Sequence, residues 1–512
     1  MKKIIDILAK YDVNKNVCQL YGDYIAKLNV KKPSFFDKNK KLVLVTATSP
    51  TPQGEGKTTV AINLTDALNK LGKKACTVLR EPSIGPCFGT KGGAAGAGKA
   101  KVLPEEAINM HFTGDIHALT TANNLICAVI DNHIFQGNYF KINPNKIKIK
   151  RVIDMNDRSL RDITIRINEN ISYQTSFDIT AACELMSIFC LSKSKDDFIN
   201  RVNSMVVAFD KKDKPITVKQ FNITNAIVDI MKDCFMPNAV QTLEGNLAIV
   251  SGGPFANISI GVSSVFGLNV ASQVADYIIT EAGFGSELGL EKFIDIVMQE
   301  NDLPLKCIVL VSTIKSLVFQ GNGDITKGIV NLQQHIDNLK NYKIPFVVAI
   351  NKFDDDKKQD LQFVQDYLKK NNIIYCLNTG YADGAKGGID LAKIVVRFAN
   401  KSIAKPQFIY QTKESVKTKV TKIVNKVYGM DQIIWSNEAQ SALTEQLDNL
   451  NFYICLSKDP KKIYTDLNQD GKPCVKIQKI QVDYGAKLIV VLCNKVFRMP
   501  GLGTNPRAQN WK

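Results

Sequence analysis

The sequence lacks the features that mark secreted, membrane-spanning and nucleic-acid-binding chains. Its first residues, MKKIIDILAKYDVNKN, contain neither a sufficient apolar stretch nor a cleavage site, so we expect no secretory signal. Residues 245–275 carry no charge, but Gly, Pro, Ser and Asn interrupt them, which favours buried strand and loop over a membrane span. Basic blocks with interleaved aromatics are also missing, which argues against a nucleic-acid partner despite a net charge of +17. We therefore expect a cytoplasmic protein whose positive charge reflects scattered lysines or serves small anions.

Cysteine pairing is a second missing feature. Twelve cysteines occur without a single C-x-x-C spacing, and many lie in apolar runs, such as Cys127 in NLICAVI and Cys307 in KCIVLV. Such cysteines are typical of small, reduced core residues rather than of a disulfide framework or a zinc site.

The pattern of apolar segments predicts an α/β fold. A chain of 512 residues is too long for one core, and its length suggests about three domains. Short β-type runs without strict alternation, separated by helical patterns, indicate mostly parallel sheets covered by helices. We place domain boundaries near residues 300 and 400, and a softer stretch at 417–429 before a C-terminal part with its own strands. The expected strands are residues 41–47, 75–79, 247–251, 275–281, 306–312, 345–351, 373–378 and 487–493; the expected helices are 58–71, 288–300, 326–340 and 357–370.

A glycine-rich stretch, TPQGEGKT, follows the first predicted strand and opens a helix. A strand, a glycine-rich turn and a helix N-terminus together offer a phosphate free backbone N–H groups, a helix dipole and a lysine. Lys57 would reach the terminal phosphates and Thr58 could hold Mg²⁺. The loop is a variant, because Thr51 stands where the first glycine of the common phosphate loop belongs. The predicted nucleotide-binding residues are Thr51, Pro52, Gln53, Gly54, Glu55, Gly56, Lys57 and Thr58.

A second stretch, GAAGAGKA (93–100), has the lysine but no hydroxyl after it and no predicted strand before it. It is a poor candidate for a second nucleotide loop. Just upstream, Arg80 and Glu81 follow a predicted strand, and six glycines occur within residues 85–98. Sites in α/β proteins form at the carboxyl ends of strands. Arg80 there could bind a carboxylate or an acyl phosphate, or could make an ordinary surface ion pair.

Several long segments, in order along the chain, resemble formate–tetrahydrofolate ligase, also called 10-formyltetrahydrofolate synthetase. These segments are TPQGEGKTT, REPSIGPCFGTKGGAAGAG, INMHFTGDIHALTTANNLICAVIDNHIFQGN, RVIDMNDRSLR, QTLEGN, GGPFANISIG, ADYIITEAGFGSELGLEKF and MPGL. The resemblance implies that ATP, formate and tetrahydrofolate give 10-formyltetrahydrofolate, ADP and phosphate through formyl phosphate. It also implies Mg²⁺, a monovalent cation (K⁺ or NH₄⁺) and a homotetramer.

The resemblance assigns roles to particular residues. Lys57 and Arg80 match the catalytic lysine and arginine that contact the acyl phosphate. Phe353 and Tyr381 match two aromatic positions that stack on the pterin, although a tryptophan usually stands at the second. Glu81 and Asp115 match acids that we associate with the cation site. In this interpretation residues 1–300 bind the nucleotide, residues 301–400 contribute to the folate site and residues 401–512 form a smaller C-terminal domain.

The sequence also departs from the family pattern. Ser251 and Ile260 replace histidines, Lys315 replaces an arginine, and Gln320 replaces a histidine. These changes leave the phosphate loop and Arg80 intact, but they leave open a catalytically impaired relative that binds nucleotide or folate as a module.

Two further alternatives concern other chemistry. The segment NKFD (351–354) resembles the guanine-reading motif of GTPases, although it lies nearly 300 residues from the phosphate loop. Three of the four histidines, His111, His117 and His133, fall near Asp115 and Asp131, which is a pattern that could hold zinc or manganese.

Overall fold

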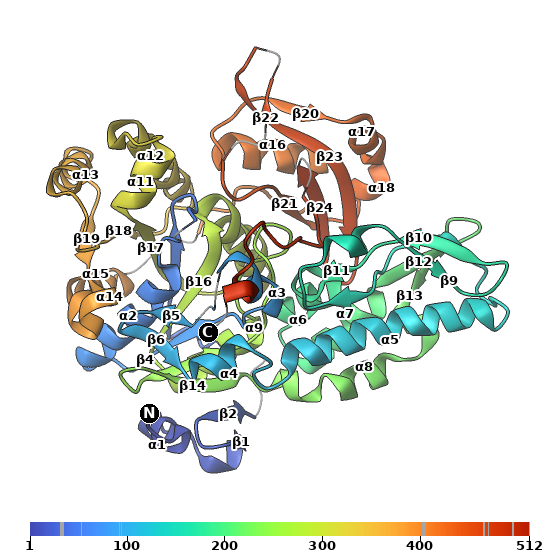
Figure 1. Cartoon of the computed structure of the whole chain (residues 1–512), viewed down its shortest axis with the longest axis horizontal. Coiled ribbons are helices and arrows are strands. Elements are labelled where there is room, and N and C mark those ends of the chain that lie inside the picture. Colours follow the sequence, from blue (N-terminus) through green and yellow to red (C-terminus); the bar gives the residue numbers. More distant parts are fainter. Residues whose placement is uncertain are drawn as a thin grey trace.

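A large twisted sheet forms the centre of the computed structural model (Figure 1). Its main path runs in the order β1-β2-β14-β15-β4-β16-β3-β17-β18-β19, and the strands from β15 to β19 are all parallel. An antiparallel edge of β1, β2 and β14 completes it. The structure describes residues 1–30, 35–52, 54–91, 93, 95–401, 406–463, 466–468, 470–493 and 496–510. The strands are β1 Cys18–Tyr21, β2 Ile25–Leu28, β3 Lys41–Ala47, β4 Ala75–Leu79, β14 Asn238–Thr242, β15 Leu247–Val250, β16 Tyr277–Gly285, β17 Leu305–Ser312, β18 Phe346–Asn351 and β19 Tyr375–Asn378.

Helices cover both faces of this sheet, as the unbroken apolar runs require. Along β3, Val43 and Val45 pack with Leu64 of α2 (Lys57–Lys70) and with α15 (Ile389–Ala399). Leu42 and Leu44 point to the opposite face, which α9 (Val265–Val274) and α12 (Ile325–Asn341) cover. Successive residues of a strand face opposite sides, so a strand buried on both faces must be apolar at every position. The predicted α/β class is therefore confirmed.

The central sheet continues through residues 301–400. Strands β17, β18 and β19 extend it beyond β3, and α13 (Lys358–Lys370) precedes β19. The proposed division near residue 300 does not coincide with a break in this sheet, and the domain limits stay a prediction.

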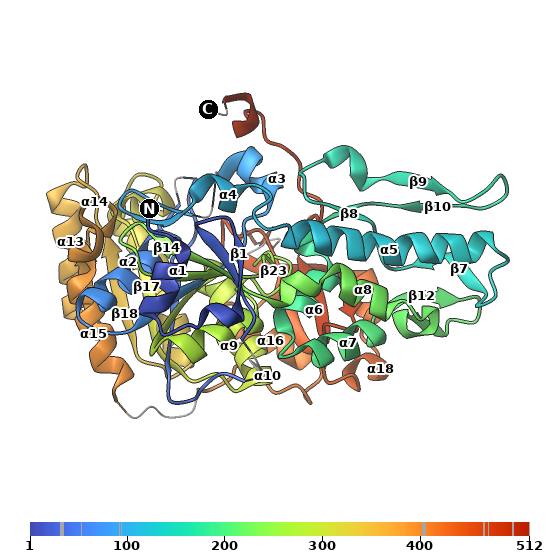
Figure 2. The ribbon, with the colours of Figure 1, turned by 90° about the horizontal axis from the view of Figure 1, so that it is seen from below.

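A projecting arm of residues 115–235 was not anticipated from the sequence. The 21-residue helix α5 (Asp115–Phe135) runs along it, and α6 (Glu184–Leu191), α7 (Lys195–Ser204) and α8 (Thr224–Ile230) pack nearby. Small sheets of β7 (Ile142–Ile147), β12 (Val206–Asp210) and β13 (Pro215–Thr217), and of β9 (Ile163–Arg166) with β10 (Ser172–Thr175), complete it (Figure 2). Among the described residues, no helix is both long and apolar enough to cross a bilayer.

The C-terminal part has a sheet of its own, in the order β20-β23-β24-β21. The stretch 417–429, read as soft from the sequence, instead lies mostly in helix α16 (Val416–Lys426), which buries Val420, Ile423 and Val424. Its apolar residues recur at helical spacing between lysines, which gives an amphipathic helix and explains why the composition misled the prediction. The strands are β20 Ile433–Trp435, β21 Tyr453–Ser457, β22 Asp466–Leu467, β23 Pro473–Asp483 and β24 Leu488–Cys493.

A buried ion pair joins this C-terminal part to the central sheet. Lys458, just after β21, lies 3.2 Å from Glu287, which follows β16, and the two side chains are 0% and 1% exposed. Burial raises the pKa of the Glu287 carboxyl, but the charge of Lys458 is the main influence that outweighs it, and the net pKa lies below its ordinary value. Each charge is therefore stable only in the presence of the other.

We expect Lys458→Met to destabilise the protein by about 3–5 kcal/mol, because it leaves the Glu287 charge buried without its main partner. Urea unfolding gives the free-energy difference, with Lys472→Met, an exposed lysine of the same part, as the control. The double change Lys458→Met and Glu287→Gln should recover part of the loss. A Lys458→Met protein as stable as the control would contradict this prediction.

Candidate active site

The predicted phosphate loop lies between β3 and α2, as the sequence indicated. Gly54 and Gly56 both have φ of +78°, a left-handed conformation that favours glycine, and α2 begins at Lys57. A Cβ added to Gly56 would also lie 2.4 Å from Asn351 Nδ2. The first N–H groups of a helix have no acceptor within it, so the start of α2 is suited to an anion.

Glu55 shapes this loop from inside. Its side chain is 1% exposed and accepts a hydrogen bond from the Thr51 N–H at 2.6 Å, while its carbonyl accepts one from Asn351 Nδ2 at 3.3 Å. Lys57 Nζ lies 3.7 Å from Glu55 Oε2. Pro52 is exposed, and Gln53 lies outside the described residues. The loop is thus held in shape by its own glutamate and by the end of β18.

Glu281 connects the loop to Arg80. The Thr58 hydroxyl donates to Glu281 Oε2 at 2.8 Å, and Arg80 NH2 lies 3.9 Å from Glu281 Oε1. Thr58 lies in the first turn of α2, and Arg80 follows β4. Glu281 lies on β16, which pairs with both β3 and β4. Sequence reasoning did not single out Glu281, although it ends the predicted strand ADYIITE. A carboxylate at the carboxyl end of a strand next to the phosphate loop was the signal.

A cavity of about 310 Å³ opens beside Arg80. Arg80 NH1 donates to the Pro254 carbonyl at 3.1 Å, while its buried Nε has no hydrogen-bond partner among the described residues. The Arg80 side chain itself lines the cavity. The cavity wall includes Glu281, Phe255, Phe284, Phe497, Pro500 and Gly501, so segments far apart in the chain enclose it.

Phe353 and Tyr381, the two rings predicted to stack on a pterin, lie together. Their centroids are 6.1 Å apart and their planes meet at 52°. Phe353 follows β18, and Tyr381, 45% exposed, lies in α14 (Gly380–Asp383). An adjacent pair with one exposed ring is a suitable surface for a flat ligand.

The second glycine stretch supports Tyr381. The Lys99 N–H donates to the Tyr381 carbonyl at 2.9 Å, and a Cβ on Gly98 would lie 2.3 Å from that oxygen. Residues 96–103 form a hairpin of β5 (Gly96–Ala97) and β6 (Ala100–Leu103). This glycine stretch therefore positions an aromatic ring, which accounts for its small residues.

Glu81 and Asp115 are buried near each other, together with Lys27. Burial, with the nearby charge of Asp115, raises the pKa of the Glu81 carboxyl well above its usual range. Lys27 Nζ lies 2.7 Å from Asp115 Oδ1, and Asn238 Nδ2 donates to Asp115 Oδ2 at 2.8 Å. Both oxygens of Asp115 thus have partners, one of them cationic. These residues fit an added monovalent cation poorly, and the assignment of one to them stays a prediction.

The three clustered histidines do not meet. His117 and His133 are sixteen positions apart on α5, a separation of roughly 24 Å. His133 stacks on Phe140 and accepts a hydrogen bond from the Phe140 N–H, while Asp131 pairs with Arg151. In the described part of the chain, no group of three or more His, Cys, Asp or Glu side chains is arranged to hold a metal ion.

Two departures from the family pattern have simple structural explanations. Ser251 is buried and shares a hydrogen bond with Ser264 at 2.6 Å, and Ile260 is a fully buried core residue. Neither leaves an unpaired group.

The architecture defines an α/β protein with a candidate site at the carboxyl ends of its parallel strands. The family model described as formate–tetrahydrofolate ligase matches residues 1–512. A formate–tetrahydrofolate ligase of Pelagibacter ubique (strain HTCC1062) is 41% identical over 539 aligned residues, which cover 100% of this chain and 95% of that protein. The chain belongs to the formate–tetrahydrofolate ligase family.

The fourth histidine, His335, contacts Ser49 just before the phosphate loop and Ser286 just after β16. Its Nε2 lies 3.1 Å from Ser49 Oγ and its Nδ1 lies 2.8 Å from Ser286 Oγ. Burial lowers the pKa of His335 to about 4, although the Glu287 carboxylate opposes this. The ring is therefore neutral near pH 7.

This depressed pKa makes folding pH-dependent. Below about pH 6.5 the unfolded chain protonates His335 and the folded chain does not, so stability present above pH 6.5 is lost as the pH falls towards 4. We expect the stability advantage of the wild type over His335→Asn to shrink by about 3 kcal/mol across this window. Urea unfolding at pH 7, 6, 5 and 4 measures it, with the exposed His117→Asn as control. A constant advantage would show that His335 titrates alike in both states.

Proposed function

We propose that the protein joins formate to tetrahydrofolate with ATP, and that Lys57, Thr58, Arg80 and Glu281 form the reaction centre. One observation carries this assignment: the Glu281 carboxylate is bonded to the Thr58 hydroxyl and faces the Arg80 guanidinium. It therefore brings the nucleotide loop and the candidate formate-binding arginine to one point. The family membership supports this reaction, and supports neither a GTPase nor a catalytically impaired relative.

Positioning and positive charge are what the first step requires. Formate is a weak nucleophile, and its charge is repelled by the terminal phosphate of ATP. Lys57 at the start of α2 and the Arg80 guanidinium beside the cavity supply the compensating charge and hydrogen bonds. A formate oxygen attacks the γ-phosphorus, ADP leaves, and formyl phosphate forms.

The second step requires that water be kept away from formyl phosphate. Formyl phosphate is a mixed anhydride that water destroys, and the cavity beside Arg80 is walled by Phe255, Phe284 and Phe497. The folate amine then attacks the formyl carbon and phosphate leaves. The Phe353 and Tyr381 rings would hold the pterin for this transfer.

The residues present fit a magnesium ion at the nucleotide. The Thr58 hydroxyl and the Glu281 carboxylate are neighbouring oxygen donors, which is the chemistry that Mg²⁺ prefers. When bound, Mg²⁺ would neutralise charge on the phosphate oxygens. Glu281 would orient the Thr58 hydroxyl and place a negative charge beside the ion.

The resemblance also suggests a cytoplasmic homotetramer. We retain this as a proposal, together with the three units 1–300, 301–400 and 401–512.

Replacing Lys57 tests the reaction directly. We expect Lys57→Ala to lower kcat for formate-dependent ADP release by at least a hundredfold, since one electrostatic stabiliser contributes about 3–4 kcal/mol. The assay contains ATP, formate and tetrahydrofolate, and Lys73→Ala, an exposed lysine after α2, is the control. Wild-type turnover in Lys57→Ala would remove this residue from the mechanism.

Replacing Glu281 tests the metal assignment without turnover. Glu281→Gln keeps an acceptor for Thr58 but removes the charge, so we expect calorimetry to show about tenfold weaker binding of ADP with Mg²⁺ and little change with EDTA. Asp276→Asn, before the opposite end of β16, is the control. Equal losses with and without Mg²⁺ would mean that Glu281 only supports the loop.

A further inference from the structure

Two segments that resemble the ligase family have no role in the proposed reaction centre, and the structure places them against each other. They are RVIDMNDRSLR (151–161), which belongs to the arm, and MPGL (499–502), near the C-terminus. Arg161 Nε donates a hydrogen bond to the Met499 carbonyl at 2.9 Å, and Arg158 donates one to the Leu502 carbonyl. We call residues 497–502 the C-terminal strap.

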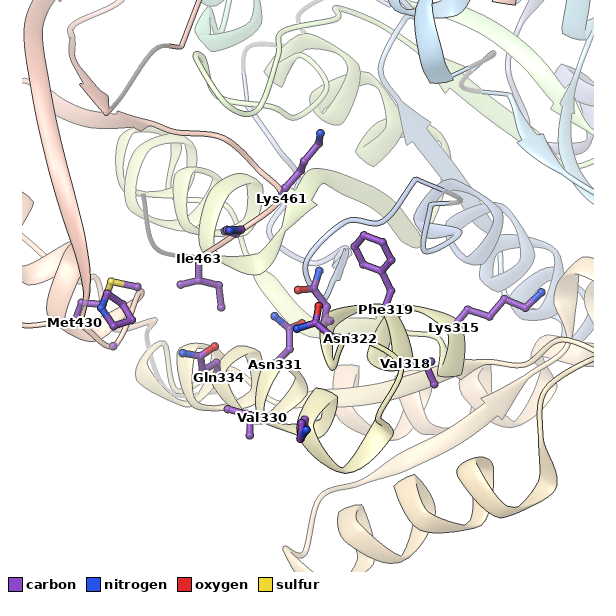
Figure 3. A pocket seen from close by; sticks show the side chains of 16 residues that line it. Lys315, Val318, Phe319, Asn322, Val330, Asn331, Gln334, Met430, Lys461 and Ile463 are labelled. Carbon is purple, nitrogen blue, oxygen red and sulfur yellow. The ribbon is translucent and has the colours of Figure 1, made fainter. Parts of the chain in front are cut away.

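The C-terminal strap forms part of the wall of the cavity beside Arg80. Phe497 and Pro500 line this cavity together with Asn156 of the arm. A larger cavity, of about 1110 Å³, lies between α11 (Ile314–Gln320), α12 and the C-terminal part, and Figure 3 shows the side chains around it. None of the described residues that line the larger cavity belongs to the arm or to the strap. Of these two cavities, the arm and the strap enclose only the one beside Arg80.

Arg161 holds the strap by two kinds of contact. Besides its hydrogen bond to the Met499 carbonyl, its guanidinium carbon lies 3.9 Å from the centroid of the Phe497 ring, which is a cation–π contact. Phe497 is 50% exposed, so burial alone does not fix this ring at the cavity wall. A guanidinium that lies over the ring and also bonds the strap backbone fixes both.

Other contacts anchor the remaining residues of the strap. A Cβ added to Gly501 would lie 2.6 Å from Arg158 Nε, so any side chain there would displace this guanidinium. The Arg498 side chain lies 3.2 Å from Asp483 of β23, and the Arg498 carbonyl accepts a hydrogen bond from the Ile179 N–H of the arm at 3.0 Å. Successive residues of the strap are thus anchored, mostly to the arm, which fixes their course past the cavity.

The same arm segment also contacts the chain that follows Arg80. The Asp154 carboxylate accepts a hydrogen bond from the Ser83 hydroxyl and another, at 2.9 Å, from the Ile84 N–H. Residues 154–161 therefore connect the loop that carries the candidate formate-binding arginine with the strap that walls its cavity.

We propose that Arg161 is a positioning residue that holds the C-terminal strap in place, so that the cavity beside Arg80 protects formyl phosphate from water. This inference rests on the proposed function, since it requires formyl phosphate in that cavity. In the productive step the folate amine attacks the formyl carbon, the bond from that carbon to the phosphate oxygen breaks, and the amine proton leaves with phosphate or water. Where water enters, it attacks the same carbon and releases formate and phosphate, so ATP is consumed without product.

An arginine that only stabilises the fold would behave differently. Its loss would lower the amount of folded enzyme, so ADP release and product formation would fall together. An arginine that keeps the strap docked is distinguished by the ratio between them, because water destroys formyl phosphate after ADP has already formed.

The test variants remove the two partners of the contact separately. Arg161→Met removes the donor and the charge but keeps an unbranched side chain, and Phe497→Ala removes the ring but keeps the hydrogen bond to the strap backbone. The controls are Arg166→Met, an exposed arginine of β9, and Phe135→Ala, a 55% exposed ring at the end of α5. ADP and 10-formyltetrahydrofolate are measured in the same reaction, and ADP release is also measured with formate but without tetrahydrofolate. Urea unfolding shows whether each variant is folded.

We expect the wild type and the controls to form ADP and 10-formyltetrahydrofolate in equal amounts and to release ADP slowly without tetrahydrofolate. Both test variants should release ADP about fivefold faster without tetrahydrofolate, which is the change expected when one hydrogen bond or ring contact no longer favours the docked strap. With tetrahydrofolate they should form more ADP than product.

Equal amounts of ADP and product in both test variants, with unchanged ADP release without tetrahydrofolate, would overturn the proposal. A raised KM for tetrahydrofolate with equal amounts of ADP and product would also overturn it, and would assign the strap to folate binding. If Arg161→Met does not fold, Phe497→Ala decides between these outcomes. The wild type itself tests the proposed function: absence of formate-dependent ADP release would refute that function, whereas product formation with unaltered test variants would refute only the role of the strap.

Discussion

The candidate site depends on the pairing of one buried carboxylate with a hydroxyl and a guanidinium. Glu281 is 4% exposed, and a charge at that depth is tolerated only beside compensating groups. Thr58 and Arg80 provide them, and each lies after a strand that neighbours β16 in the sheet. Three adjacent parallel strands end at the same edge of the sheet. The loops that follow them therefore lie close together although they are distant in sequence.

Charge is distributed unevenly around this pairing. Lys57 and Arg80 lie in or beside enclosed space, where an electrostatic interaction is less screened than in water. Lysines at the surface are screened by water, and each contributes little alone. The formal charge of +17 does not distinguish these two settings.

Much of the fold was predictable because a strand that is buried on both faces of the sheet appears in the sequence as a continuous apolar run. The run KLVLVTA became β3 with the same bounds, and α2 begins at Lys57 directly after Gly56. The arm was not predictable from the apolar runs, because its strands, such as INPNKI at β7, are polar and only partly buried. Lys27 beside Asp115 was missed for another reason: only the pairing of β2 with β14, more than two hundred residues later, brings that lysine inside.

The residues of the candidate site also divide into those that the sequence could indicate and those that it could not. The loop, Arg80, Phe353 and Tyr381 each follow a predicted strand or precede a predicted helix, so local pattern and family resemblance were enough to propose them. Glu281 and the role of Gly98 required tertiary contacts: a hydrogen bond to Thr58 in one case and the Tyr381 carbonyl in the other. Sequence spacing contains no record of either contact.

The wall contributed by Pro500 and Gly501 has a consequence for biosynthesis. Met499, beside it, accepts a hydrogen bond from Arg161 of the arm at 2.9 Å, so this segment is tied across the molecule. A ribosome delivers these residues several hundred codons after the phosphate loop. A nascent chain can therefore build the central sheet while the cavity beside Arg80 still lacks this wall, and the cavity is complete only when this last segment has docked.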